Sequence, residues 1–168
     1  MPQKSKKSQV PAQGSRKTFK AAVMAVPDMA GNFRNGVQAL AESHRKGLKN
    51  MQLATGSLDL DAALAASRPN DHRWDYGIGL PFSAGAEKVL WLEVHYAASG
   101  ETERVIKKLT ALKSWLQSNA EALQALPRIY VWQLSNVERS PNDRRKRNAL
   151  AEKHGLQRVQ GVLDLATL

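Results

Sequence analysis

Residues 88–97 read KVLWLEVHYA, and this run decides the fold of the chain. Its apolar, β-branched and aromatic residues are typical of a largely buried strand. Residues 73–80, RWDYGIGL, alternate bulky side chains with small or polar ones, which is the period of a second strand. The short turn at 81–86 joins the two runs. The sequence therefore predicts a β-hairpin over residues 73–97.

Helical and strand-like segments alternate on the C-terminal side of this hairpin. Residues 101–119 place apolar side chains at helical spacing on one face, and residues 128–134 predict a third strand. A charged helix is expected to end near His154, with Gly155 at the position that glycine favours after a helix. A weaker strand is expected over 156–165.

Two helices are expected on the N-terminal side. The first covers 33–49 with Asn32 as its N-cap, and the second covers 59–66 and ends at the turn residues 68–71. The whole order is α, short α, β, β, α, β, α, β. This order predicts an α/β fold: a three-layer-like sandwich with a mixed central sheet of about four strands flanked by helices.

Length and composition exclude several classes of protein. The 168 residues suffice for one ordinary domain, and 42% hydrophobic with 24% charged residues is close to the globular average. The absence of cysteine excludes a disulfide scaffold, a cysteine-ligated zinc site and a thiol nucleophile, and it favours a cytoplasmic location. No segment approaches the ~20 apolar residues of a membrane helix, so we expect no membrane partner.

The chain is strongly basic, with 25 Lys and Arg residues against 15 Asp and Glu and a formal net charge of +10. Such a charge favours a polyanionic partner, nucleic acid first. Residues 1–20 hold no acidic residue, and we expect them to form a disordered basic arm before a single α/β domain at 21–168. The arm is interpreted either as a tether to nucleic acid or as a solubilising tail. Its basic residues are Lys4, Lys6, Lys7, Arg16, Lys17 and Lys20.

The hairpin also carries the residues with the strongest chemical signal. Asp75 stands among the small residues of the first strand, and Glu93 and His95 stand two residues apart on the second. Residues at i and i+2 of a strand share a face, so Glu93 and His95 are expected side by side with Asp75 opposite. Two buried carboxylates at one point repel unless a cation joins them, and Mg²⁺ or Mn²⁺ prefers such oxygen ligands. Gly77 and Gly79 leave room beside Asp75 for a backbone or a ligand.

A strand with Asp, a strand with Glu-x-(Lys), a helix and a further strand resemble the PD-(D/E)xK nuclease superfamily, over roughly residues 33–135. The resemblance implies a restriction-endonuclease-like fold and metal-dependent phosphodiester cleavage, with Asp75 and Glu93 as metal ligands. It also implies that Glu42, on the first predicted helix, assists. His95 stands where the family has its Lys. An imidazole can act as a base or ligand but supplies no permanent charge, so Lys107 or Lys108 is the candidate for that role.

Simpler interpretations of these residues stay open. Asp75 could be solvated on an edge strand, and Glu93 could pair with Lys88, with Arg73 or with His95 without any metal. Two histidines and three tryptophans are not expected to act in the site. His44 is expected in the core and His72 near the Asp75 strand. The tryptophans, which are most simply core residues, are Trp91, Trp115 and Trp132.

A second basic cluster lies at the start of the last predicted helix. It consists of Arg144, Arg145, Lys146 and Arg147. Cations at a helix N-terminus oppose the helix dipole, so binding to phosphates explains them better than local stability does, although a solvated face is the simpler alternative.

Together these features predict a Mg²⁺- or Mn²⁺-dependent nuclease, or a nuclease-like protein, acting on DNA or RNA. The alternative is a non-catalytic nucleic-acid-binding or protein-interaction module on the same fold. The sequence leaves the oligomeric state open, a homo-oligomer included.

Overall fold

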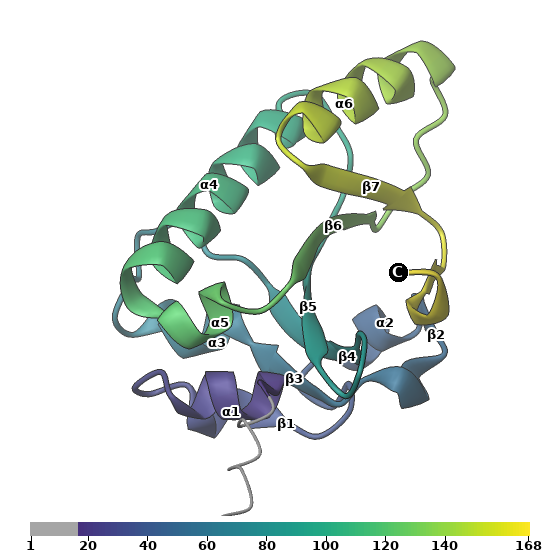
Figure 1. The fold of residues 1–168 in the computed structure, drawn as a ribbon. Helices are drawn as coiled ribbons and strands as arrows, with labels where there is room; N and C mark the ends of the chain where they lie inside the picture. Colours follow the sequence, from purple (N-terminus) through teal and green to yellow (C-terminus); the bar gives the residue numbers. More distant parts are fainter. Residues whose placement is uncertain (1–16) are drawn as a thin grey trace, which may run out of the picture.

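The computed structural model describes residues 17–168, and a mixed six-stranded sheet forms its centre (Figure 1). The strand order is β1-β3-β4-β5-β6-β7, antiparallel from β1 to β5 and parallel from β5 to β7. The predicted α/β class with a mixed sheet is confirmed, whereas about four strands is too few. The strands are β1 Phe33–Arg34, β3 Gly56–Asp59, β4 Tyr76–Pro81, β5 Glu87–His95, β6 Arg128–Leu134 and β7 Leu156–Gln160.

Apolar cores lie on both faces of this sheet. The larger core packs helices α1, α3, α4, α5 and α6 against one face. The smaller core lies under α2 and a small parallel sheet that pairs β2 with β8 (Figure 1). The bounds of these elements are α1 Phe19–Met24, α2 Glu42–Arg45, β2 Leu48–Lys49, α3 Leu60–Ala65, α4 Glu101–Asn119, α5 Glu121–Gln124, α6 Pro141–Lys153 and β8 Leu163–Asp164. Short 3-10 turns are η1 Ala30–Asn32, η2 Met51–Leu53 and η3 Leu165–Thr167.

The predicted hairpin, helix and third strand are confirmed. β4 and β5 pair antiparallel, with Tyr76 opposite Leu92. α4 then covers the sheet and leads to β6, which lies parallel to β5. α6 is followed by Gly155, whose positive φ of 72° is the left-handed conformation that glycine tolerates best.

The helix predicted over residues 33–49 is wrong. The segment forms the edge strand β1, a turned stretch, the four-residue helix α2 and the strand β2. Its apolar side chains separate into two cores: Phe33 packs on the α4 side of the sheet, and Leu40 and Leu48 pack on the other. Gly36, at φ 55°, turns the chain between them. The helical spacing of these residues therefore reflects two cores rather than one helical face.

The last predicted strand and the predicted domain start also need correction. The expected strand at 156–165 is divided, because β7 ends at Gln160, Gly161 turns with a φ of 86°, and β8 joins the other sheet. The boundary expected between residues 20 and 21 lies inside α1, whose Phe19 side chain is fully buried. The part of the predicted arm before residue 17 lies outside the described residues.

The glycines of β4 make room for protein side chains rather than for a ligand. A Cβ at Gly79 would lie 2.6 Å from Cβ of Phe19, and one at Gly77 would lie 2.7 Å from Cζ3 of Trp91. The room expected beside Asp75 is therefore filled by Phe19 of α1 and by Trp91. Among residues 17–168, no helix combines the length and apolar character needed to cross a membrane.

Candidate active site

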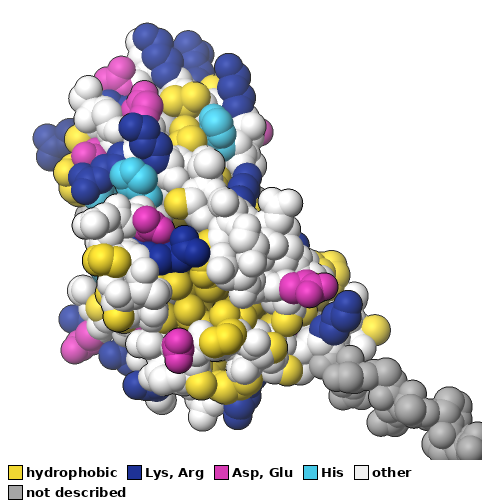
Figure 2. Space-filling model, turned by 90° about the vertical axis from the view of Figure 1, so that its left-hand side faces the viewer, with side chains coloured by type: hydrophobic (Ala, Val, Ile, Leu, Met, Phe, Trp, Pro, Cys, Tyr) yellow, Lys and Arg dark blue, Asp and Glu magenta, His cyan; other side chains and the backbone are white. Residues whose placement is uncertain are grey.

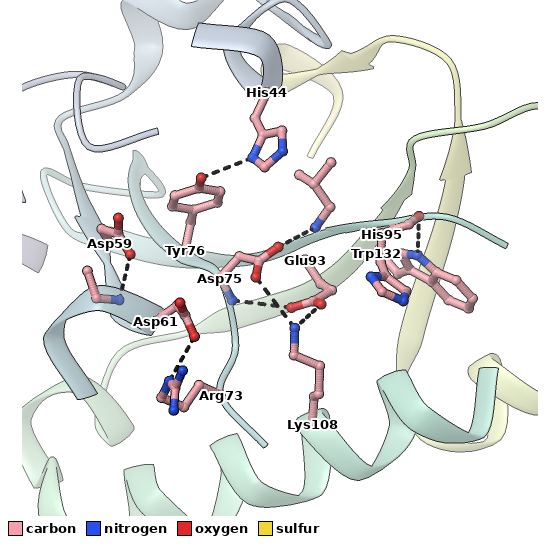
Figure 3. A network of polar contacts seen from close by, with 12 residues as sticks. His44, Asp59, Asp61, Arg73, Asp75, Tyr76, Glu93, His95, Lys108 and Trp132 are labelled. Atoms are coloured by element: carbon pink, nitrogen blue, oxygen red, sulfur yellow. Dashed lines mark hydrogen bonds and ion pairs between the residues drawn. The ribbon is translucent and has the colours of Figure 1, made fainter. Parts of the chain in front are cut away.

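Asp75 and Glu93 are joined by hydrogen bonds at the point where β4 begins and β5 nears its end. The backbone N–H of Asp75 donates to Oε2 of Glu93 at 3.2 Å, and the backbone N–H of Val94 donates to Oδ2 of Asp75 at 2.9 Å (Figure 3). Asp75 directly precedes β4, where the register sets it opposite Glu93. Each carboxylate is therefore anchored to the other's strand through one of its two oxygens.

The remaining oxygens share one ammonium group. Lys108, on α4, donates from Nζ to Oε1 of Glu93 and, at 3.4 Å, to Oδ1 of Asp75 (Figure 3). The Glu93 side chain is fully buried, while the side chains of Asp75 and Lys108 are 21% and 17% exposed. The cation that two adjacent carboxylates require is thus supplied in this structure by the chain itself.

The buried position dominates the electrostatics of Glu93. Burial, reinforced by the negative charge of Asp75, raises the pKa of Glu93 from 4.5 to about 8, although Lys108 opposes both effects. A carboxyl group whose pKa is raised strongly by burial and by a specific charge neighbour is a candidate functional residue, and structural ion-pair networks produce such shifts too.

This shift predicts how stability depends on pH. Because the pKa of Glu93 is higher in the folded protein than its ordinary 4.5, the folded state holds a proton that the unfolded chain releases between about pH 4.5 and pH 8. The contribution of Glu93 to stability should therefore be full below pH 4.5 and be lost as the pH rises to about 8. Thermal melting of the parent and Glu93→Gln across this range should show a steeper decline in the parent. Parallel curves would contradict the shift.

His95 lies on the same face of β5 but has a different partner. Its Nε2 bonds to Oε2 of Glu101, in the first turn of α4, and the hydroxyl of Tyr96 donates to Oε1 of the same carboxylate at 3.2 Å. The His95 and Tyr96 rings lie 4.5 Å apart between centroids. The hydrogen bond from His95 lowers the pKa of Glu101. The interpretation of a metal-free Glu93–His95 pair is therefore wrong.

Two residues predicted for the site lie elsewhere. Glu42, expected to assist from a long first helix, sits exposed on α2, where its Oε1 lies 3.5 Å from Nζ of Lys46. The failure of the 33–49 helix removes the reason to expect Glu42 at the site. Lys107 is exposed on α4, and its neighbour Lys108 is the lysine that contacts the carboxylates.

The simpler pairings expected for Glu93 are also absent among residues 17–168. Lys88 donates to the backbone oxygen of Leu168 at 2.7 Å, and Arg73 bonds to Asp61 at 2.8 Å. His44 bonds through Nδ1 to the hydroxyl of Tyr76 on the opposite face of the sheet, and His72 is exposed.

The basic residues predicted to bind nucleic acid divide into two groups. Arg144, Arg145 and Lys146 are exposed on α6. This helix lies at the top of Figure 1, and Lys and Arg side chains gather at the top of Figure 2. Arg147 is different: with Arg158 it binds Glu138, whose side chain is 4% exposed, so its charge already has a partner within the protein.

Most basic residues of the predicted N-terminal arm precede the part of the chain that the structure describes. These are Lys4, Lys6, Lys7 and Arg16. Lys17 and Lys20 are described, and both are exposed near the start of the fold.

Glu101 is the neighbour of the site that sequence reasoning missed. Nothing in its local sequence links it to His95, because the contact depends on where α4 starts after the turn at Gly100. The choice of Lys108 over Lys107 does have a sequence signal. Lys108 follows Val105 by three residues and precedes Leu112 by four, so it shares the buried face of α4, whereas Lys107 does not.

Comparisons with protein-family models, with curated proteins and with solved structures found no match. Any functional assignment therefore rests on the residues of this chain and their geometry.

Proposed function

We propose that this protein is a metal-dependent nuclease, or a nuclease-like protein, that acts on DNA or RNA phosphodiesters. The observation that carries the proposal is the meeting of Asp75, Glu93 and Lys108 at one point, from the start of β4, the end of β5 and the middle of α4. The order of strand with Asp, strand with Glu, helix and strand is also that of the PD-(D/E)xK resemblance.

The donor set suits Mg²⁺ or Mn²⁺. Both carboxylates present one oxygen to the same cation, the ammonium of Lys108. Hard divalent ions are commonly held by one or two carboxylates, with water and substrate phosphate completing the shell. Within residues 17–168, no group of three or more His, Cys, Asp or Glu side chains is placed to hold a metal ion. Asp75 and Glu93 would therefore hold the ion as a pair, without a third ligand of these types from residues 17–168.

The side chains around this pair have distinct roles in the proposal. A divalent ion held by Asp75 and Glu93 would supply Lewis-acid activation of the phosphate and of the attacking water. Lys108 takes the place of the family's Lys from α4 and provides the positive charge that His95 lacks as a neutral ring. His95, anchored by Glu101, lies two residues beyond Glu93 on the same face, about 7 Å along the strand.

The assignment is tested by incubating the full chain with labelled single- and double-stranded DNA and RNA, with Mg²⁺, with Mn²⁺ and with a chelator. Cleavage that requires the ion supports the proposal. His95→Lys restores the residue that the family usually carries, and it should keep or raise activity if His95 fills that role. If neither the parent nor His95→Lys cuts any substrate with Mn²⁺, the enzyme assignment fails.

The second candidate is a non-catalytic module that binds nucleic acid or protein on the same fold. The observation that favours it is the ammonium of Lys108, which already neutralises part of the carboxylate charge without an ion. Binding of nucleic acid or protein that needs no divalent ion, with no cleavage of DNA or RNA, would favour this second candidate over the nuclease.

Both candidates predict salt-sensitive binding to nucleic acid. Neutralising Arg144, Arg145 and Lys146 together should lower the slope of log affinity against log salt by ~0.7–0.9 for each phosphate that the protein no longer neutralises. Removing residues 1–16, which spares the buried Phe19, should lower it further. Filter binding with a chelator measures the slopes, and Lys46→Gln on α2 is the control. If the parent and all the variants give the same slope, these basic residues do not contact nucleic-acid phosphates.

A further inference from the structure

The ammonium of Lys108 occupies the position that the proposed function gives to a metal ion. Its Nζ contacts one oxygen of Glu93 and one oxygen of Asp75. The other two oxygens accept the backbone N–H groups of Asp75 and Val94. Each of the four carboxylate oxygens thus has a partner within the protein.

The backbone N–H groups and the Lys108 ammonium differ in how easily they can move away from the carboxylate oxygens. The backbone donors sit at the paired ends of β4 and β5, where movement would disturb the ladder between them. The Lys108 side chain is a flexible four-carbon stem with its charge at the tip. Because Glu93 is fully buried, the partly exposed Asp75 and Lys108 form the open side of the cluster. An arriving cation therefore meets Lys108 first.

An ammonium group and a divalent cation cannot share the same two oxygens. Like charges a few ångströms apart repel strongly in a poorly solvated site. When both carboxyl groups are ionised, the cluster carries two negative charges against one ammonium, so exchange of Lys108 for a divalent ion replaces one positive charge by two. The negative charge left uncompensated by Lys108 is what makes this exchange favourable.

We propose that Lys108 is a tethered counter-ion that a divalent cation must displace from Asp75 and Glu93, and that it thereby sets the ion affinity of the site. The inference rests on the proposed function for the identity of the ion-holding pair. It adds that the same lysine stabilises the ion-free protein and competes with the ion. The carboxylates therefore bind Lys108 at low concentrations of the divalent ion, and they bind the ion only at concentrations high enough to displace Lys108.

The test compares Mn²⁺ binding by full-length Lys108→Met, Lys107→Met and the parent. Binding is measured by the electron paramagnetic resonance signal of free Mn²⁺ at about pH 8.5, where carboxylate ligands are more readily deprotonated. Lys108→Met keeps a long side chain without its charge, and it should bind Mn²⁺ about tenfold more tightly than the parent. Lys107→Met, altered at an exposed position, should match the parent. Equal or weaker binding by Lys108→Met overturns the inference.

A second measurement uses the parent protein and does not depend on the folding of a variant. Acetylation of each lysine is followed by mass spectrometry, with and without saturating Mn²⁺. Lys108 should react slowly without the ion and at least about fivefold faster with it, because release from two carboxylates frees its amine. The rate at Lys107 should not change. A Lys108 rate that is insensitive to Mn²⁺ contradicts displacement.

The outcomes separate this inference from the proposed function. Tighter Mn²⁺ binding by Lys108→Met, without cleavage of DNA or RNA by the parent, keeps the counter-ion role and rejects the nuclease. Metal-dependent cleavage by the parent with no gain in Mn²⁺ affinity in Lys108→Met keeps the nuclease and rejects the counter-ion role. No Mn²⁺ binding by any of the proteins rejects both.

Discussion

Replacement of Glu93 by Gln is expected to lower metal-dependent cleavage by at least about 10²–10³-fold, the size of effect that follows loss of one preorganised charge-stabilising group. The amide keeps the shape of the side chain but loses the charge that would hold the ion. Gln also has one acceptor oxygen in place of two, so it cannot accept from both the backbone N–H of Asp75 and Nζ of Lys108. Initial rates on a labelled oligonucleotide at saturating Mn²⁺ measure the effect.

Glu42→Gln is the matched control, because Glu42 is an exposed glutamate on α2 that the sequence suggested for the same reaction. It should cleave at the parental rate. A Glu93→Gln protein that is correctly folded and as active as the parent would remove Glu93 from the reaction.

Replacement of Lys108 by Met is expected to be among the most destabilising single changes in the chain. At about pH 8.5, above the pKa of Glu93 in the parent, it leaves the buried carboxylate of Glu93 and the adjacent Asp75 without their shared cation, and breaking a buried ion pair from one side costs about 3–5 kcal/mol. For a chain of this size the melting temperature should fall by roughly 6–20 °C. Thermal unfolding followed by circular dichroism, without divalent ions, measures this fall.

Two further variants show whether the charge of Lys108 is the cause. Lys107→Met changes an exposed lysine and should stay within about 0.5 kcal/mol of the parent. The double variant Glu93→Gln, Lys108→Met should be more stable than Lys108→Met alone, because it removes the buried charge that the single change leaves unpaired. A double variant less stable than the single one would exclude this explanation.

Long elements with a clear period were predictable from the sequence. The hairpin, α4 and β6 follow from sustained apolar patterns, and each lies where its pattern places it. The strands β1, β2 and β8 have two residues each, too few to show any period. They depend on pairing partners far along the chain, such as Leu58 for Phe33 and Leu163 for Leu48.

The candidate site was predictable where it depends on the hairpin alone. Strand alternation gives the shared face of Glu93 and His95, and pairing of the strands places Asp75 opposite Glu93. The partners that come from α4 depend on how the helix docks. That docking selects Lys108 over Lys107 and brings Glu101 to His95. Glu42 was misplaced because its element was misidentified.

The central claim is that Asp75 and Glu93 hold a divalent ion together, and a crystal of the protein soaked in Mn²⁺ tests it most directly. An anomalous difference map collected above the manganese absorption edge should show one peak within about 2.0–2.5 Å of an oxygen from each carboxylate, with Nζ of Lys108 moved away from both. A map with Lys108 still bridging Asp75 and Glu93, and no manganese peak beside them, would contradict the claim.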